Sequence, residues 1–216
     1  MNWVLDNVSM IASLLVSHVV QAGSAVLASF VLALPLARLA ARHGWLRGFV
    51  VTGSGLLYAI PSLPLFVILP LVLGTGLRSV VNVVVALTLY GLALMVPQGT
   101  AAFRSVDGHL LDAATAVGYG PRSLFYKVEL PLAGPALLGG LRVVSMSTIA
   151  LVTVGGVLGV PSLGMLFVDG FQRGIPAEVL SGLVLTVLLA LVADALLVTG
   201  GRLTMPWTRG DGGRTP

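Results

Sequence analysis

Long apolar runs recur along this chain of 216 residues, and each of them is long enough to cross a lipid bilayer. A transmembrane helix needs about 20 consecutive, mostly apolar residues. These runs leave little sequence for a soluble domain. They predict an all-α membrane protein with five transmembrane helices in a single domain over residues 1–203, followed by a short cytoplasmic tail at residues 204–216. The predicted spans lie at about residues 11–37, 49–73, 80–103, 132–158 and 179–200.

The composition excludes several other classes of protein. Only 9% of the residues are charged and 56% are hydrophobic, whereas about 25% of the residues of a soluble domain are charged. This shortage excludes a typical soluble protein, a disordered chain and a nucleic-acid-binding domain, and the net charge of +4 is too small to indicate a nucleic-acid partner. The chain has no cysteine, which excludes disulfides, thiolate metal sites and cysteine nucleophiles. We predict no metal site and no catalytic residue.

The distribution of Lys and Arg predicts the orientation of the chain. The first 37 residues contain neither, so the basic region of a secretory signal is missing and the first run is expected to remain as a helix. Cytoplasmic loops of membrane proteins carry an excess of Lys and Arg. With the N-terminus outside, ten basic residues fall on the inner side and only Arg78 and Arg173 on the outer side, which predicts N-out and C-in. The ten are Arg38, Arg42, Arg47, Arg104, Arg122, Lys127, Arg142, Arg202, Arg209 and Arg214.

Prolines interrupt the second span. A proline removes one helix hydrogen bond and kinks the helix, and in lipid the freed carbonyl must find another partner. Two interpretations follow, a kinked packing helix or a break that lines a pathway. Aromatic residues near the break could offer their faces to a quaternary ammonium group, or they could serve packing. The candidate pathway or gate residues are Tyr58, Pro61, Ser62, Pro64, Phe66 and Tyr90.

Three ionisable residues fall inside the apolar runs. His18 has no carboxylate near it in the sequence, so we expect a buried, hydrogen-bonded histidine and not a proton relay. Arg142 lies near the inner end of the fourth span and Asp194 about two turns from the inner end of the fifth. An unpaired charge in a membrane is costly. We therefore expect Arg142 to reach the interface or to pair with Asp194 or a loop acid.

Residues 104–131 form the most informative segment, because helix-capping residues and glycines alternate in it. Ser105 or Asp107 can cap a short helix. Gly118 is expected to end that helix, since glycine adopts the left-handed conformation at little cost. Pro121 suits the first position of a second helix. The sequence thus predicts a cytoplasmic two-helix loop between the third and fourth spans. Its mixed charges favour a protein partner over the lipid surface.

Within this loop, D-A-A-T-A-V-G followed by L-P resembles the EAA loop of ABC importer permeases. The family pattern is Glu-Ala-Ala, three residues, Gly, a spacer, and a hydrophobic residue before Pro. This sequence has Asp in place of the Glu, which keeps the charge but shortens its reach by one methylene. The residues that match are Asp112, Ala113, Ala114, Gly118, Leu130 and Pro131.

Other motifs resemble one branch of that family. A-I-P-S-L-P-L-F at 59–66, V-E-L-P at 128–131 and P-S-L-G at 161–164 are similar to permeases for osmoprotectants such as glycine betaine, choline, carnitine or proline betaine. The segments at 170–173 and 201–208 are most similar to actinobacterial members.

The resemblance implies a complex in the bacterial cytoplasmic membrane, built from two permeases, an ATPase dimer and an extracytoplasmic substrate-binding protein. The loop around Asp112 and Gly118 would dock on the ATPase and pass its movement to spans that alternate between inward-facing and outward-facing states. The chain has no G-x-x-x-x-G-K-[ST] motif. ATP and Mg²⁺ are therefore expected on the ATPase, with no cofactor on this chain. Asp169 and Arg173, in the outer loop, are expected to contact the binding protein.

Alternatives remain open at this point. The second permease is either an identical chain or a similar one. The solute could be methionine or another small molecule. A secondary carrier or channel subunit would need intramembrane carboxylates along a pathway, and only Asp194 lies clearly within a span. A membrane scaffold whose loop merely recruits a partner is a further alternative.

Overall fold

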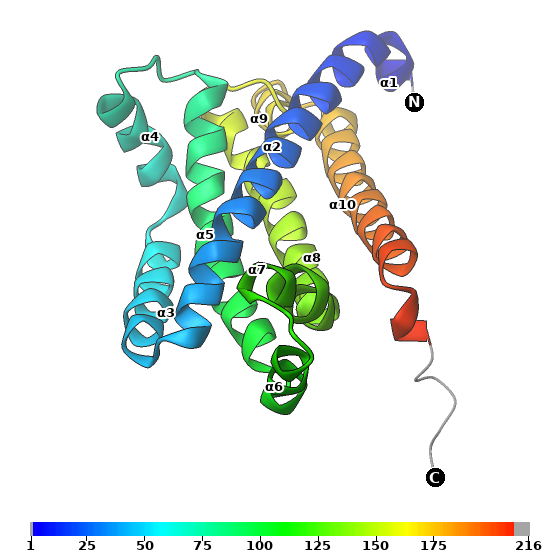
Figure 1. Cartoon of the computed structure of the whole chain (residues 1–216). Coiled ribbons are helices and arrows are strands. Elements are labelled where there is room, and N and C mark those ends of the chain that lie inside the picture. Colours follow the sequence, from blue (N-terminus) through cyan, green and yellow to red (C-terminus); the bar gives the residue numbers. More distant parts are fainter. Residues whose placement is uncertain (1, 210–216) are drawn as a thin grey trace.

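Four long helices run between the two ends of the molecule, and two shorter ones, α3 (Gly44–Ala59) and α4 (Ser62–Leu73), together cover the same height (Figure 1). The computed structural model describes residues 2–209, and every regular element in that range is helical. Four segments are long and apolar enough to cross a membrane, and α3 with α4 pass the same test as a pair. The predicted all-α fold with up to five spans is confirmed. The main helices are α1 (Asn2–Asp6), α2 (Val8–Arg42), α3 (Gly44–Ala59), α4 (Ser62–Leu73), α5 (Val80–Arg104), α6 (Gly108–Ala116), α7 (Pro121–Leu124), α8 (Leu130–Gly155), α9 (Gly164–Gln172) and α10 (Pro176–Thr204).

Small residues allow α2 and α5 to pack closely at the centre of the bundle. A Cβ atom at Gly91 of α5 would lie 2.0 Å from Ser29 Oγ of α2, and one at Gly99 would lie 2.8 Å from the Ala37 Cβ. Small residues at these positions let the two helix backbones approach closely. In lipid, packing and not the hydrophobic effect drives helix association. Helices α3 and α8 then pack against this pair.

The second span is broken. Helices α3 and α4 meet at an angle of 100°. Ile60 and Pro61 between them have extended backbones, with ψ of 126° and 137°. A residue that precedes proline is disfavoured in the helical region, and proline lacks the N–H that would continue the helix.

The fourth helical segment begins at Pro121, and not near residue 132 as the sequence predicts. A π-helical turn, η1 (Phe125–Glu129), joins α7 directly to α8, and in it the Leu130 N–H donates to the Phe125 carbonyl. This widened turn comes where Pro131 cannot supply an N–H, so the helix continues through Pro131 and the proline does not close the loop. The second half of the predicted loop, α7 with η1, thus runs directly into α8.

The segment at residues 159–178 also differs from the predicted connector, because it contains α9. A short 3-10 turn, η2 (Gly156–Leu158), and a left-handed Gly159 (φ +75°) lead out of α8. Helix α9 packs on α10, in whose most apolar stretch only 6% of the residues are buried, whereas half of the corresponding stretch of α5 is buried. A further 3-10 turn, η3 (Pro206–Arg209), follows α10.

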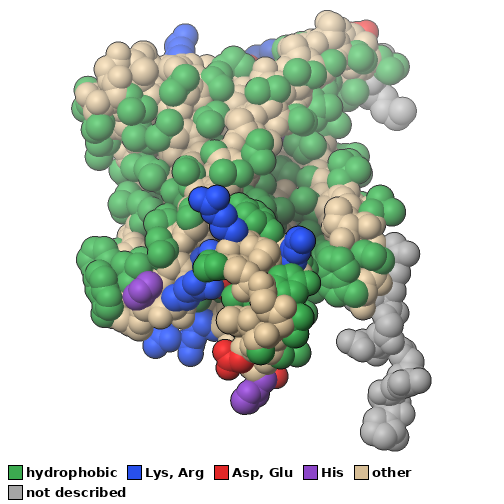
Figure 2. Space-filling view, in the orientation of Figure 1, with side chains coloured by type: hydrophobic (Ala, Val, Ile, Leu, Met, Phe, Trp, Pro, Cys, Tyr) green, Lys and Arg blue, Asp and Glu red, His purple; other side chains and the backbone are tan. Residues whose placement is uncertain are grey.

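Apolar and basic side chains occupy different parts of the surface (Figure 2). Figure 2 shows apolar side chains over most of this face, with Lys and Arg gathered towards the end that carries α6 and α7. Figure 1 places the described end of α10 at that same end, while α1, α9 and the turn after α4 lie at the other.

A glycine contact between α8 and α9 yields a stability prediction. A Cβ atom at Gly164 would lie 2.0 Å from the Thr153 carbonyl oxygen, which is backbone and cannot rotate away. We expect Gly164→Ala to destabilise the protein by about 1–3 kcal/mol, as overpacking does. The melting temperature of the variant in detergent would measure this loss of stability. Gly139→Ala, at an α8 glycine with open space around its Cβ position, is the control. Equal melting temperatures for the two variants would contradict this packing.

Candidate functional site

The candidate site is the loop formed by α6 and α7. The Asp107 carboxylate caps α6 by accepting a hydrogen bond from the His109 N–H at 2.9 Å, so of the two predicted caps Asp107 is the one used. The helix ends at Ala116, and Gly118, two residues beyond it, has a left-handed φ of +97°. The Gly118 N–H bonds to the Thr115 carbonyl and the Tyr119 N–H to the Ala114 carbonyl. Pro121 then takes the first position of α7. The predicted capping and turn are therefore confirmed.

Helix α6 buries none of its residues. Its principal contacts within the chain are with α7 and η1. The loop also exposes apolar side chains, with Val117 81% and Leu110 50% exposed. A capped helix that offers an uncovered, partly apolar surface is suited to a groove on another protein. Of the predicted loop residues, Asp112, Ala113 and Gly118 are exposed, whereas Ala114, Leu130 and Pro131 are partly buried.

The structure adds a residue that the sequence analysis did not single out. Glu129, in η1, is buried, and its Oε2 accepts hydrogen bonds from Arg38 and Arg42 near the end of α2. The sequence could not reveal these contacts, because Arg38 and Arg42 lie 91 and 87 positions away from Glu129 in the chain. The V-E-L-P segment showed an acid just before the fourth span, but not what it contacts.

The predicted pathway residues gather around the break between α3 and α4, with one exception. The Tyr90 hydroxyl donates to the Ile60 carbonyl at 2.5 Å, which satisfies a backbone group freed by the break. Tyr58 meets Tyr90 edge to face at 6.0 Å between ring centroids and is 47% exposed. Phe66 is instead fully buried in the core. Pro61 and Pro64 are exposed and Ser62 is half-buried.

At the opposite end, the residues predicted to contact a binding protein lie around the α9–α10 turn. Asp169 is half-buried and Arg173 is exposed. Arg173 Nη1 lies 3.8 Å from Glu178 Oε2. The Glu178 side chain is buried, and neither of its carboxylate oxygens has a hydrogen-bond partner within the described part of the chain. Phe171, beside them, is 85% exposed.

The ionisable residues within the spans are paired largely as predicted. Arg142 and Asp194 form a two-fold hydrogen-bonded ion pair between α8 and α10, with N–O distances of 2.6 and 2.8 Å. His18 is fully buried and its Nε2 lies 3.0 Å from the Ile149 carbonyl oxygen. Both expectations are confirmed. Between residues 2 and 209, no three His, Cys, Asp or Glu side chains converge as metal ligands would.

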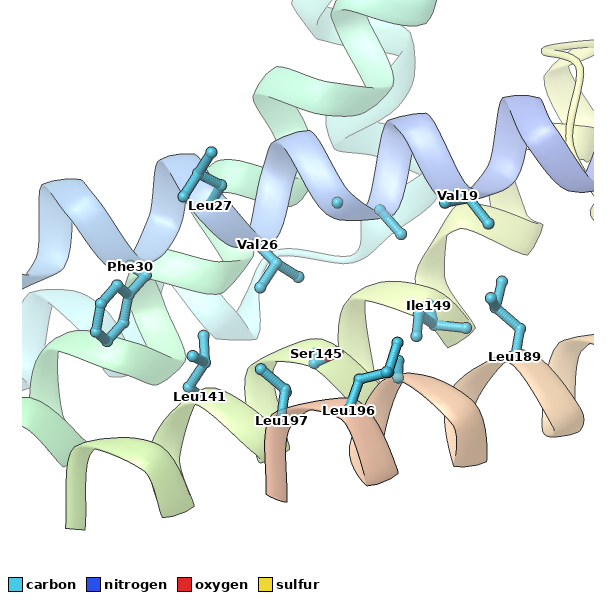
Figure 3. Close-up of a pocket in the computed structure, with 13 residues that line it drawn as sticks. Val19, Val26, Leu27, Phe30, Leu141, Ser145, Ile149, Leu189, Leu196 and Leu197 are labelled. Carbon is cyan, nitrogen blue, oxygen red and sulfur yellow. The ribbon is translucent and has the colours of Figure 1, made fainter. Parts of the chain in front are cut away.

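A cavity of about 400 Å³ lies between α2, α8 and α10 (Figure 3). Side chains from the three helices, such as Val26, Leu141 and Leu197, face one another across it, and the lining is apolar except for Ser145. An apolar cavity cannot replace the water that solvates a charge. The cavity is therefore suited to a lipid chain or an apolar side chain and not to an ionic solute.

Three comparisons place the chain among known proteins. Residues 26–200 match the family described as "Binding-protein-dependent transport system inner membrane component". The chain is 32% identical over 199 residues to the osmoprotectant import permease protein OsmW of Salmonella typhimurium, which covers 91% of this chain and 92% of OsmW. It is 29% identical over 181 residues to the carnitine transport permease protein OpuCD of Listeria monocytogenes, covering 83% and 80% of the two chains.

The fold is similar to that of a solved structure. A chain from the inward-facing conformations of the MetNI methionine ABC transporter superposes with a TM-score of 0.76, covering 93% of this chain and 97% of that one, at 21% sequence identity. At this identity the likeness concerns the fold alone.

The Arg142–Asp194 pair is expected to hold α10 against α8. Asp194→Asn leaves an arginine among apolar helices without its counter-charge, so we expect a lower melting temperature and a lower folded yield. The exchanged pair Arg142→Asp/Asp194→Arg should recover much of the loss. Thermal unfolding in detergent measures both. If Asp194→Asn has the same melting temperature as the parent protein, the ion pair does not hold α10 in place.

Proposed function

Because the chain belongs to the binding-protein-dependent transport system inner membrane component family, and is thus the multi-pass permease subunit of an ABC importer, we propose that its α6–α7 loop is the docking surface for the ATPase subunit. The single observation that carries this proposal is the exposed, capped α6, which packs little against its own chain. Asp112, Ala113 and Gly118 lie on its exposed surface. Leu130 and Pro131 are instead the first two residues of α8 and are partly buried.

The loop end of the bundle is proposed to be cytoplasmic, which gives N-out and C-in. The described helix ends support this orientation, because seven basic residues lie towards the loop end and two at the other. The loop-end residues are Arg38, Arg42, Arg47, Arg104, Arg122, Lys127 and Arg202, and those at the other end are Arg78 and Arg173.

The solute is proposed to be an osmoprotectant such as glycine betaine. The support is that OsmW and OpuCD, which match most of this chain, are named for osmoprotectant import and carnitine transport. A methionine importer is supported only by similarity of fold. The break between α3 and α4 is proposed as a gate, since irregular backbone at membrane depth is tolerated where it lines a cavity or is buried in protein. The exposed ring of Tyr58 could bind a quaternary ammonium there.

The partners follow from the same family. The ATPase subunits are proposed to bind ATP and Mg²⁺, since this chain has no nucleotide-binding lysine motif. The α9–α10 turn, with Asp169 and Arg173, is proposed to meet the extracytoplasmic binding protein. The exposed apolar face of α10 is proposed to be covered by the second permease and by lipid, and an identical chain or a similar one would serve.

Reconstituted uptake tests the proposal as a whole. Liposomes with the permease and its ATPase, supplied with binding protein and radiolabelled glycine betaine, should accumulate solute only when ATP is inside. Hydrolysis stimulated by the binding protein without betaine uptake would keep the importer and reject the solute. An ATPase that does not associate would reject the assignment of the loop and favour a carrier.

The turn at Gly118 yields a sharper prediction. Gly118→Val places a β-branched residue at a φ of +97°, which is strained whatever the space around it. We expect uptake to fall by about tenfold or more while the protein still inserts, because the loop loses its rigid turn. Gly120→Ala is the matched control, since Gly120 has an ordinary φ of −71° and open space around it. Normal uptake by Gly118→Val would reject the rigid-loop mechanism.

A further inference from the structure

A buried carboxylate joins the loop to α2. Glu129 Oε2 accepts hydrogen bonds from Arg38 Nε at 3.0 Å, Arg38 Nη2 at 2.8 Å and Arg42 Nη2 at 3.0 Å. The side chain of Glu129 is only 4% exposed, whereas those of Arg38 and Arg42 are 24% and 47% exposed. One acid is thus shared by two cations that lie a helical turn apart. We name these three residues the Glu129 junction.

Aromatic rings extend the Glu129 junction to a third helix. The Arg38 guanidinium lies over the Phe125 ring at 4.0 Å from its centroid, within the range of a cation–π contact. Phe125 in turn packs on Phe103, near the end of α5, at 6.1 Å between centroids. The junction therefore connects η1 with the loop-side ends of both helices at the centre of the bundle.

The Glu129 junction also lies on the route from the loop to the bundle. Helix α6 touches the rest of the chain mainly through α7 and η1. Apart from the short link to α5, a force applied to α6 therefore enters the bundle near η1. This π-helical turn is the irregular point of the segment, and such turns inside α-helices are often found at functional sites. Glu129 is its last residue.

The ion pairs of the Glu129 junction oppose separation of η1 from α2. If η1 moved away from α2, it would leave a buried carboxylate without its counter-charges, which is unfavourable. The movement of η1 and that of the end of α2 are for this reason tied together.

We propose that the Glu129 junction passes the displacement of the loop to α2, and that Glu129 is a positioning residue for coupling ATP hydrolysis to transport. This inference rests on the proposed function of the α6–α7 loop as the ATPase docking surface. It adds to that function a specific contact, made by residues that are not among the six matched positions of the EAA-like motif.

The test uses the complete transporter in liposomes and measures three quantities. These are the amount of ATPase that co-purifies, the rate of ATP hydrolysis, and the amount of solute accumulated per ATP hydrolysed. Glu129→Gln keeps the size of the side chain and removes its charge. We expect normal assembly and continued hydrolysis, with solute per ATP lowered by about tenfold. A residue that only stabilised the fold would lower assembly and leave this ratio unchanged.

Companion variants identify the contact. Arg38→Gln should lower the ratio as Glu129→Gln does, and the double variant should be no worse than either, because both remove the same interaction. Arg42→Gln removes one hydrogen bond and should have a smaller effect. Arg47→Gln is the control, an arginine at the same end of the bundle that is outside the junction.

The outcomes separate this inference from the proposed function. An unchanged ratio in assembled Glu129→Gln complexes overturns the junction and leaves ATPase docking intact. If that variant does not assemble, the milder Arg42→Gln decides, and an unchanged ratio there overturns the inference as well. A parent transporter without ATP-dependent uptake refutes the proposed function and the inference with it.

Discussion

The close approach of α2 and α5 is the contact on which the rest of the structure depends. In lipid, helices associate by packing and by polar contacts, so small residues at the interface decide which pair forms the centre. Gly91 opposite Ser29 marks that contact here. Once α2 and α5 are placed, Tyr90 can reach the break in the second span. Arg38 comes at the same time to the end of the bundle where the loop begins.

Polar side chains within the apolar helices join segments that are distant in the chain. His18 of α2 bonds to a backbone carbonyl of α8, and Arg142 of α8 pairs with Asp194 of α10. Each contact satisfies a group whose exposure to lipid would be costly, and each also sets the relative height of two helices. Helix α10 offers a largely uncovered apolar surface, which fits a subunit that functions beside a second permease.

Local sequence was sufficient to predict the first half of the loop. A cap at Ser105 or Asp107, the left-handed Gly118 and the helix start at Pro121 were predictable, because each depends on the conformation of one or two residues, although the structure alone selected Asp107 as the cap. The boundary at Pro131 was not, since the π-helical turn before it absorbs the missing N–H. The burial of Phe66 was not predictable either, because its position beside the proline break is visible in the sequence and its packing in the core is not.

The sequence by itself determined the class of the molecule, the approximate number of its spans, the bias in charge between its ends, and the loop whose motif identifies the family. These features depend on composition and short-range spacing, which lipid and backbone geometry constrain strongly. The tertiary structure alone decided which side chains meet, above all the sharing of Glu129 by Arg38 and Arg42. Such a contact depends on how two helices pack across about ninety intervening residues, and no local pattern in the chain specifies that packing.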